Sequence, residues 1–402
     1  MFNIQIPFNK PALLGQEFEY IHQALKRGKI SGDGHFTKLC QERLQHMTGA
    51  GSALLTTSCT HALEMAALLL DIKPGDEVIV PSFTFVSTAN AFVLRGARPV
   101  FVDSRPDTLN LDENQIERSL TLRTKAIVPV HYAGVGCAMN RILEIARRHG
   151  IAVVEDNAHG LFGRYRGQPL GSFGSMAAQS FHETKNISCG EGGALLINDP
   201  GFSHRAEILR EKGTNRASFF RGQVDKYTWV DVGSSYVPSD VLAAFLYAQL
   251  EAAERIQAVR KTIWWRYHHE LNDWAADHDI WLPEVPADCE QAYHMYYLVL
   301  PSLEDRQAFI RHLGERGVLA VFHYVPLHLS PMGQKFGGQP GDCPVAEALS
   351  DRLVRLPFFF DLSEAEQASV VEAVRSFEPA RIKGLANLQR SLTEPEPVRQ
   401  SL

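Results

Sequence analysis

A lone lysine followed by three closely spaced glycines is the first feature of the sequence that could do chemistry. Lys185 lies in the segment SFHETKNISCGEGGALL, ahead of Gly190, Gly192 and Gly193. A lysine amine forms a Schiff base with an aldehyde, and glycines allow the backbone to fold closely around a bound ligand. The alternative is a solvated lysine that opens a turn, which is common beside glycine clusters. Other parts of the chain must decide between these interpretations.

Two further segments could supply a carboxylate and an anion site. IAVVED ends at Asp156, and a carboxylate at the end of a strand can hold a proton on a ring nitrogen. TTSCTHALEMAALLL places Ser58, Cys59 and Thr60 at the start of a helix, where free N–H groups and the helix dipole attract phosphate. Asp, Ser and Thr are also ordinary helix caps. Neither segment is therefore decisive by itself.

Aromatic residues follow another predicted strand in the segment PSFTFVSTANAF, which carries Phe83 and Phe85. A ring in this loop could stack on a flat ligand, although aromatic side chains more often pack in a core. A phosphate site, a carboxylate, an aromatic ring and an amine together match the chemistry of pyridoxal 5'-phosphate. The conjunction of the four features, in this order, predicts that cofactor.

Short apolar segments alternate with helical patterns in the first half of the chain, which predicts a mostly parallel α/β sheet covered on both faces. The predicted strands cover residues 53–57, 77–80, 99–102, 126–130, 152–155, 177–181 and 194–197. Ligands of such sheets bind beyond the carboxyl ends of the strands. Asp156 and Lys185 both fall there.

A long helical pattern begins near Ser239 and runs past Arg260, and it is expected to link two lobes. The part that follows mixes helices with two predicted strands, AYHMYYLVL and LAVFHYV, which indicates a smaller α+β domain. We predict an N-terminal arm and large cofactor-binding domain over residues 1–250, a small domain over 251–378 and a flexible tail over 379–402.

The composition is that of a globular protein, with 402 residues, 45% of them hydrophobic, and a net charge of −6. No basic run suits nucleic acid or an anionic membrane surface, and no apolar run is long enough to cross a bilayer. The six cysteines lack CxxC spacing and the first residues lack a signal-peptide pattern, so we expect reduced thiols and a cytoplasmic protein. The sixteen histidines show no HExxH spacing, which argues against a metal site.

Several segments, in the same order, resemble the DegT/DnrJ/EryC1/StrS family of sugar aminotransferases. The resemblance extends over residues 5–376 and is carried by TSCTHAL, PSFTFVSTANA, VVEDNAH, SFHETKNISCGEGGAL, HYVPLHLSP and RLPFFFDLSEAEQ. It implies the PLP-dependent transferase fold type I, which is like that of aspartate aminotransferase. It also implies pyridoxal 5'-phosphate as the cofactor and a nucleotide-linked keto sugar as the substrate.

The resemblance assigns four residues to the ring of the cofactor. Lys185 would bind the aldehyde and Asp156 would pair with the pyridine nitrogen. His159 would face the phenolic oxygen, and Phe85 would stack on the ring.

The resemblance assigns the cofactor's phosphate to Cys59, Thr60 and Ser180. Cys59 replaces a glycine that the family tends to have, which requires a negative φ at this position. Ser235 stands where family members often place an asparagine that reaches the phosphate of the neighbouring subunit. The cross-subunit contact therefore differs from the family's pattern.

Residues 212–251 resemble most the family members that make dTDP-4-amino-4,6-dideoxygalactose for enterobacterial common antigen. This implies dTDP-4-keto-6-deoxyglucose as the acceptor, glutamate as the amino donor and a homodimer with shared active sites. Guanidinium groups suit a diphosphate, although surface ion pairs explain the arginines equally well. The candidate substrate contacts are Arg216, Arg221, His323, Tyr324 and His328.

One alternative remains open, and the residues argue against two others. The chain could act on another nucleotide keto sugar or leave an equatorial amine at C4. A dehydratase of this family would have histidine in place of the anchoring lysine, and Lys185 argues against it. A cofactor-binding regulator without turnover is expected to lose Lys185 or Asp156, and both are present.

Overall fold

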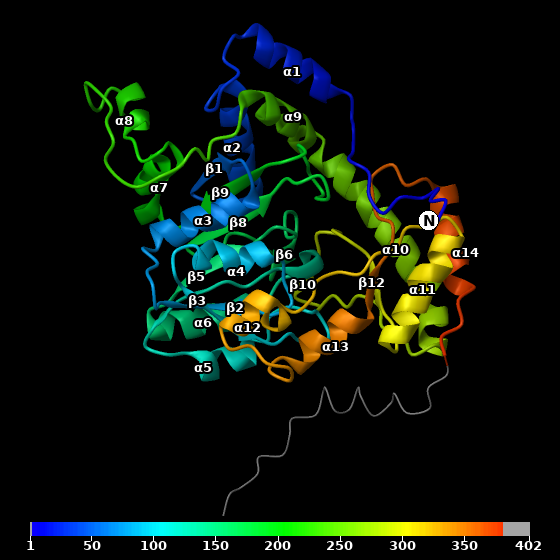
Figure 1. Ribbon diagram of the computed structural model, residues 1–402. Helices are drawn as coiled ribbons and strands as arrows, with labels where there is room; N and C mark the ends of the chain where they lie inside the picture. Colours follow the sequence, from blue (N-terminus) through cyan, green and yellow to red (C-terminus); the bar gives the residue numbers. More distant parts are fainter. Residues whose placement is uncertain (1, 381–402) are drawn as a thin grey trace, which may run out of the picture.

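The structure, a computed structural model, describes residues 2–380, and its large domain is built on a seven-stranded sheet (Figure 1). The strand order is β1-β9-β8-β5-β4-β2-β3. Strand β9 is antiparallel to both of its neighbours, whereas β3, β2, β4, β5 and β8 are parallel. The bounds are β1 (Ser52–Thr56), β2 (Glu77–Pro81), β3 (Arg98–Val102), β4 (Thr124–Ile127), β5 (Ala152–Asp156), β8 (Met176–Ser180) and β9 (Gly193–Ile197). The seven predicted strands and the mostly parallel sheet are confirmed.

Both faces of the sheet are covered by helices. Successive side chains of each strand point to opposite faces and therefore pack in different cores. On one face Leu195 packs with α3 (Cys59–Leu69) and α4 (Val86–Val93). On the other face Leu196 packs with α2 (His35–Thr48) and α9 (Asp240–Glu251), and α6 (Met139–His149) covers the strands beyond them. Burial on both faces explains why these strands read as continuous apolar segments.

The small domain has its own core, which contains Trp264, Tyr267, Phe309, Val354 and Phe359. Helix α10 (Ala253–Asp277) runs from the large domain along this core (Figure 1). The other elements of the small domain are β11 (Tyr297–Val299), α11 (Leu303–Glu315), α12 (Pro331–Lys335), α13 (Pro344–Arg352), β12 (Leu353–Arg355) and α14 (Glu364–Arg375).

The remaining elements are short or lie at the edges of the large domain. They are α1 (Gln16–Lys26), α5 (Ile116–Ser119), α7 (Ser203–Arg210), α8 (Arg216–Phe220), β6 (Arg164–Tyr165), β7 (Gln168–Pro169) and β10 (Cys289–Glu290). Strands β10, β6 and β7 form a small antiparallel sheet, and β11 pairs with β12. Four single turns of 3-10 helix occupy residues 113–115, 132–134, 200–202 and 327–329.

Three details of the predicted elements were wrong. The helix predicted from Ser239 past residue 260 is divided at Ala252 into α9 and α10, because α9 packs in the large-domain core and most of α10 in the small-domain core. The strand predicted in AYHMYYLVL shrinks to β11, since Arg260 binds the preceding carbonyl groups. The strand predicted in LAVFHYV is a single bridge from Val321 to Arg355.

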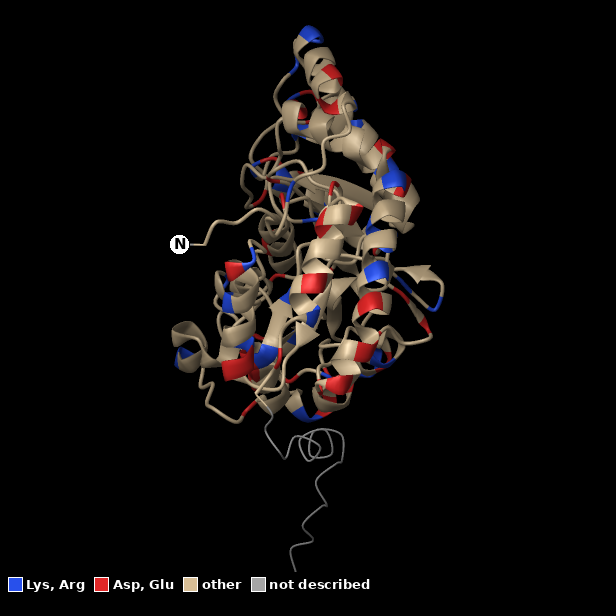
Figure 2. Cartoon of the chain, turned by 90° about the vertical axis from the view of Figure 1, so that its right-hand side faces the viewer, with Lys and Arg blue, Asp and Glu red and all other residues tan. Residues whose placement is uncertain are grey.

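The predicted domain boundary after residue 250 lies beside the α9–α10 junction. The predicted tail falls, from residue 381 onwards, outside the described residues. Within residues 2–380, none of the helices has the length and apolar character needed to span a membrane. Figure 2 shows basic and acidic residues mixed along the helices of the face it draws.

Candidate active site

A cavity of about 730 Å³ lies at the carboxyl ends of β5 and β8, where the small domain and the N-terminal arm meet the sheet. Its size and position are typical of a ligand site in an α/β protein. Of the thirteen residues predicted from the sequence, nine line this cavity: Cys59, Thr60, Phe85, Asp156, His159, Ser180, Lys185, His323 and Tyr324.

Lys185 enters the cavity from the connection between β8 and β9. Two of the following glycines are required by the backbone: Gly190 has a φ of +84°, and a Cβ on Gly193 would lie 2.3 Å from the carbonyl carbon of Ser58. Burial lowers the pKa of Lys185 to about 8, against the opposing effect of the Cys59 and Asp156 charges. An amine with this pKa is partly neutral near neutral pH and can attack an aldehyde.

Asp156 is the last residue of β5, and both of its carboxylate oxygens are held. The hydroxyl of Thr88 donates to Oδ2 (2.7 Å), and the backbone N–H of Ala158 donates to Oδ1 (3.2 Å). Burial raises the pKa of Asp156, whereas these two hydrogen bonds and the Lys185 charge lower it. A capping role for Asp156 would thus explain only Oδ1, which accepts from the N–H of Ala158. The carboxylate also lines the cavity.

The first turns of α3 and α4 meet at the cavity, and Cys59, Thr60 and Ser87 of these turns line it. Ser58 caps α3 by accepting from the N–H of His61 (3.1 Å), and the Thr60 and Ser87 hydroxyls lie 2.8 Å apart across the two helices. Cys59 is the first residue of α3 and has no positive φ, as the replacement of a glycine requires. Two helix N-termini beside hydroxyl groups form a site suited to a phosphate.

Two stacked histidines form the floor beside Asp156. The rings of His159 and His294 have centroids 4.2 Å apart and planes 21° apart. Nδ1 of His294 lies 2.8 Å from Oδ1 of Asn186, whose amide nitrogen donates to the carbonyl of Ala292 (2.7 Å), so His294 carries its proton on Nδ1. Burial holds the pKa of both rings well below the ordinary value. Among the described residues, Nδ1 of His159 has no hydrogen-bond partner, although it is buried.

Aromatic residues form the wall on the side of the small domain. Tyr324 stacks on His323 with centroids 3.6 Å apart, and the hydroxyl of Tyr132 lies 2.7 Å from Nδ1 of His323. The two phenylalanines of PSFTFV differ in exposure: Phe83 is 1% exposed and belongs to the core, whereas Phe85 is 55% exposed. Phe85 is therefore the ring available for stacking on a ligand.

Three predicted residues lie on the α8 side of the molecule and do not line the cavity of this chain. Arg216 pairs with Glu211 (3.2 Å) and Arg221 with Glu207 (2.8 Å), as the alternative of surface ion pairs expected. Ser235 is exposed and forms a backbone bridge to Glu211. A role for these residues within their own chain's cavity has no support from this geometry.

His328 also lies away from the cavity, which corrects its prediction as a substrate contact. It is fully buried, with Nδ1 2.6 Å from Oγ of Ser82 and Nε2 2.9 Å from Oε1 of Glu347. Because both ring nitrogens have partners, His328 joins the end of β2 to the small domain.

The structure adds site residues that sequence reasoning missed. Phe8 and Asn9 of the N-terminal arm line the cavity, and the amide of Asn9 donates to the carbonyl of Glu183 (3.1 Å). His294 and Arg355 line it from the small domain. Only the type of His294, a histidine within an apolar strand pattern, could have been noticed; the others have no local signal.

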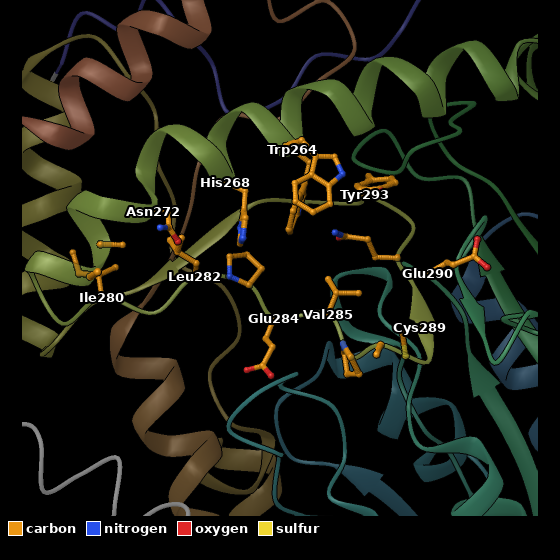
Figure 3. Close-up of a pocket in the computed structure, with 17 residues that line it drawn as sticks. Trp264, His268, Asn272, Ile280, Leu282, Glu284, Val285, Cys289, Glu290 and Tyr293 are labelled. Carbon is orange, nitrogen blue, oxygen red and sulfur yellow. The ribbon is translucent and has the colours of Figure 1, made fainter.

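A second cavity of about 660 Å³ lies beneath α10 (Figure 3). Trp264, His268, Glu284 and Glu290 line it, and its lining contains neither lysine nor arginine. Tyr293 lies in this lining, whereas the next residue, His294, lies in that of the first cavity. Without an amine for an aldehyde, this second cavity does not have the chemistry of the predicted cofactor.

The residues of the first cavity fit pyridoxal 5'-phosphate group by group. Lys185 supplies an amine for the aldehyde and Asp156 a carboxylate for the ring nitrogen. The start of α3 and α4 supplies N–H groups for the phosphate. The unpartnered nitrogen of His159 is a buried polar atom that a bound polar group would satisfy.

Comparison with known proteins gives the same assignment over almost the whole described chain. The model of the DegT/DnrJ/EryC1/StrS aminotransferase family matches residues 12–375. The spore coat polysaccharide biosynthesis protein SpsC of Bacillus subtilis (strain 168) is 33% identical over 378 residues, which cover 92% of this chain and 96% of SpsC. GDP-perosamine synthase of Escherichia coli O157:H7 is 32% identical over 377 residues, which cover 92% of this chain and 98% of the synthase.

Solved structures agree with the sequence comparisons. The aminotransferase TlmJ of Streptoalloteichus hindustanus has a TM-score of 0.85 at 31% identity, covering 92% of this chain and 98% of TlmJ. Spr1654 of Streptococcus pneumoniae, described as a sugar aminotransferase, has a TM-score of 0.85 in its PLP form at 28% identity, covering 92% of this chain and 98% of Spr1654. The predicted α/β fold class and the predicted cofactor, pyridoxal 5'-phosphate, are confirmed.

Proposed function

Because the chain belongs to the DegT/DnrJ/EryC1/StrS aminotransferase family, we propose that it transfers the amino group of L-glutamate to C4 of dTDP-4-keto-6-deoxy-D-glucose. The products are dTDP-4-amino-4,6-dideoxy-D-galactose and 2-oxoglutarate. The observation that carries the aminotransferase chemistry is the placement of Lys185 and Asp156 in one cavity with two helix N-termini. The choice of sugar rests on the resemblance of residues 212–251.

Asp156 holds a proton on the ring nitrogen of the cofactor, since its carboxylate is fixed by Thr88 and Ala158. When bound, pyridoxal phosphate supplies an aldehyde for the amine and an electron-withdrawing ring. The N–H groups at the start of α3, with Thr60 and Ser180, bind its phosphate. The ligand is thereby held between a charged group at one end and helix dipoles at the other.

Lys185 holds the cofactor and, once the donor has taken its place, moves protons. Its amine removes the proton from Cα of glutamate and, in the second half of the reaction, delivers a proton to C4 of the sugar. A pKa of about 8 suits both directions of transfer near neutral pH. His323 and Tyr324 form the wall against which the sugar binds.

We propose a homodimer in which the α8 segment, defined as residues 212–235, reaches the neighbouring cavity. This segment extends from the body of the large domain (Figure 1) and exposes Phe220 (68%) and Trp229 (79%). A partner surface would bury these rings. Arg216, Arg221 and Ser235 would then contact the diphosphate of the substrate or the cofactor phosphate of the partner. We also place the reaction in the cytoplasm, where the six free cysteines would stay reduced.

A second candidate is the same reaction on a GDP-linked keto sugar. It is favoured by the 32% identity to a protein named GDP-perosamine synthase. The two candidates differ in the nucleotide that the cavity mouth accepts, while the chemistry at Lys185 is the same.

The test follows the visible absorption of the purified protein. Glutamate is expected to remove the band of the lysine-bound cofactor, and dTDP-4-keto-6-deoxyglucose is expected to restore it. NMR of the product then gives the configuration at C4, with an axial amine expected. An equatorial amine, or restoration by a GDP-linked sugar alone, would reject the proposed substrate and product; no response to glutamate would reject the proposed donor.

A further inference from the structure

Two cationic side chains, Lys185 and Arg355, line the cavity among the residues that the structure describes. The cofactor accounts for Lys185, but no part of the assignments above uses Arg355. Its backbone is firmly placed, because its N–H donates to the carbonyl of Val321 (2.8 Å) and its carbonyl accepts from the N–H of Val321 (3.1 Å). On the other side, β12 pairs Arg355 with Tyr297 of β11. The guanidinium thus stands on a rigid edge of the small domain.

The guanidinium is held in place but its charge is unmatched. Nη2 donates to the carbonyl of Phe322 (3.0 Å), and the group lies over the ring of Phe8, 4.7 Å from its centroid. Nε is buried and has no hydrogen-bond partner within residues 2–380, and no described carboxylate forms an ion pair with Arg355. By contrast, Arg105 pairs with both Asp107 and Glu113. Arg355 is partly buried, and a partly desolvated cation without an anion costs free energy that a bound anion would recover.

Two kinds of anionic group enter the cavity in the proposed reaction, the carboxylates of glutamate and the diphosphate of the sugar nucleotide, and they lie at different distances from the reacting atoms. In an amino acid the carboxylate is attached to the carbon that carries the reacting amine. In the sugar nucleotide the diphosphate is attached to C1, across the ring from the reacting C4. Arg355 lies near the reacting end of the cavity, because it binds the carbonyl of Phe322 (3.0 Å) and the hydroxyl of Tyr324, two residues further on, lies 3.5 Å from Nε2 of His159. The position therefore favours the carboxylate.

We infer that Arg355 binds a carboxylate of the amino donor, presenting its fork of N–H groups to the two oxygens. The inference rests on the proposed function, in which the donor is glutamate. Phe8 acts as a positioning residue: the N–H of Phe358 donates to its carbonyl (3.1 Å), which fixes the ring beneath the guanidinium. The N-terminal arm thus helps to build the donor site.

The matched control is Arg352, three residues earlier in the chain. Arg352 is buried, whereas Arg355 is partly buried. Arg352 has two nitrogens without partners among the described residues and lies over the ring of Trp281 (4.8 Å), but it is absent from the cavity lining. Arg355→Gln and Arg352→Gln therefore each remove a guanidinium with unpartnered nitrogen among the described residues, and only Arg355 lines the cavity. Arg355→Lys keeps the positive charge but lacks the paired N–H groups of the guanidinium. It replaces Arg355→Gln in both measurements if that variant does not fold.

The first readout separates the two half-reactions in the holoenzyme. Arg355→Gln is expected to raise the glutamate concentration for half-maximal loss of the absorption band by about 10- to 100-fold. The reverse half-reaction, started with the amino sugar product and no amino acid, is expected to change less than about twofold. Arg355→Lys is expected to show a smaller loss for glutamate, and Arg352→Gln to match the wild type in both.

The second readout is calorimetric titration with glutarate, a dicarboxylate without an amine, which measures binding without turnover. Arg355→Gln is expected to weaken glutarate binding at least tenfold relative to Arg352→Gln. Unchanged glutarate binding, or a defect in the amino sugar half-reaction as large as that with glutamate, would overturn the inference and assign Arg355 to the diphosphate or to folding. The absorption band of the wild-type protein could fail to respond to glutamate while Arg355→Gln still weakens glutarate binding. That outcome would reject glutamate as the donor and keep Arg355 as a carboxylate site.

Discussion

Thr88→Val tests whether an ionised Asp156 is required. Valine has nearly the shape of threonine, so the substitution removes one hydroxyl, which donates to Oδ2 of Asp156 at 2.7 Å. Thr88 is fully buried, and water does not replace the lost donor. Burial already raises the pKa of Asp156, and the Thr88 hydrogen bond is the largest influence that lowers it. Its loss therefore raises this pKa further.

A hydrogen bond to a charged group contributes about 1.5–3 kcal/mol, which corresponds to roughly one to two pKa units at about 1.4 kcal/mol per unit. Activity requires the carboxylate form, which is lost as the pH falls. The acidic limb of kcat/KM against pH is thus expected to move upward by about one to two units, while the rate on the plateau changes less. The profile reports the coupled titration of Asp156 with the bound ring nitrogen.

Thr48→Val is the control, because Thr48 is also buried and its hydroxyl donates to a backbone carbonyl in α2 (2.7 Å). It is expected to alter stability but leave the acidic limb in place. An unmoved limb in Thr88→Val, with cofactor bound, would refute the argument that Asp156 must be ionised. Equal movement in both variants would assign the effect to the fold instead.

Three further outcomes are expected. Because the pKa of Lys185 is about 8, cofactor uptake by the apoprotein, followed by stopped-flow absorbance, accelerates about tenfold per pH unit below pH 8 and then levels off; acceleration up to about pH 10 would indicate an ordinary lysine. Lys185→Arg removes the reactive amine, so the absorption band of the lysine-bound cofactor disappears and turnover falls by at least about 100-fold; turnover near the wild-type rate would contradict the role of Lys185. Gly193→Ala forces a methyl group to within 2.3 Å of Ser58, so cofactor affinity measured by equilibrium dialysis falls by about 1–3 kcal/mol, whereas Gly51→Ala, with its nearest contact at 3.3 Å, keeps it.

Local pattern was enough to place the residues that line the cavity at the carboxyl ends of the strands. The alternation of apolar segments with helical patterns located all seven strands of the main sheet. In a parallel sheet the strand ends share one edge, so Asp156 and Lys185 were bound to meet there once the strands were known. Ser58 was recognisable as a helix start because capping is a property of neighbouring residues.

Long-range packing decided the rest of the site. Arg355 and His294 reach the cavity only because the small domain docks against the sheet, and Phe8 because the N-terminal arm crosses to the small domain. His328 was misplaced for the same reason: its neighbours in sequence could not reveal that Ser82 and Glu347 occupy both of its nitrogens.

The sequence by itself determined the chemical types at the strand ends, the helix starts and the sheet, since these depend on periodicity and on contacts within a few residues. The tertiary structure decided which distant side chains complete the site and which arginines are already paired. The physical reason is that burial and hydrogen-bond satisfaction are properties of the packed molecule. Arg221 and Arg355 are the same residue type in sequence, and only their surroundings distinguish them. Arg221 forms a surface ion pair with Glu207, whereas Arg355 lines the cavity without a described carboxylate partner.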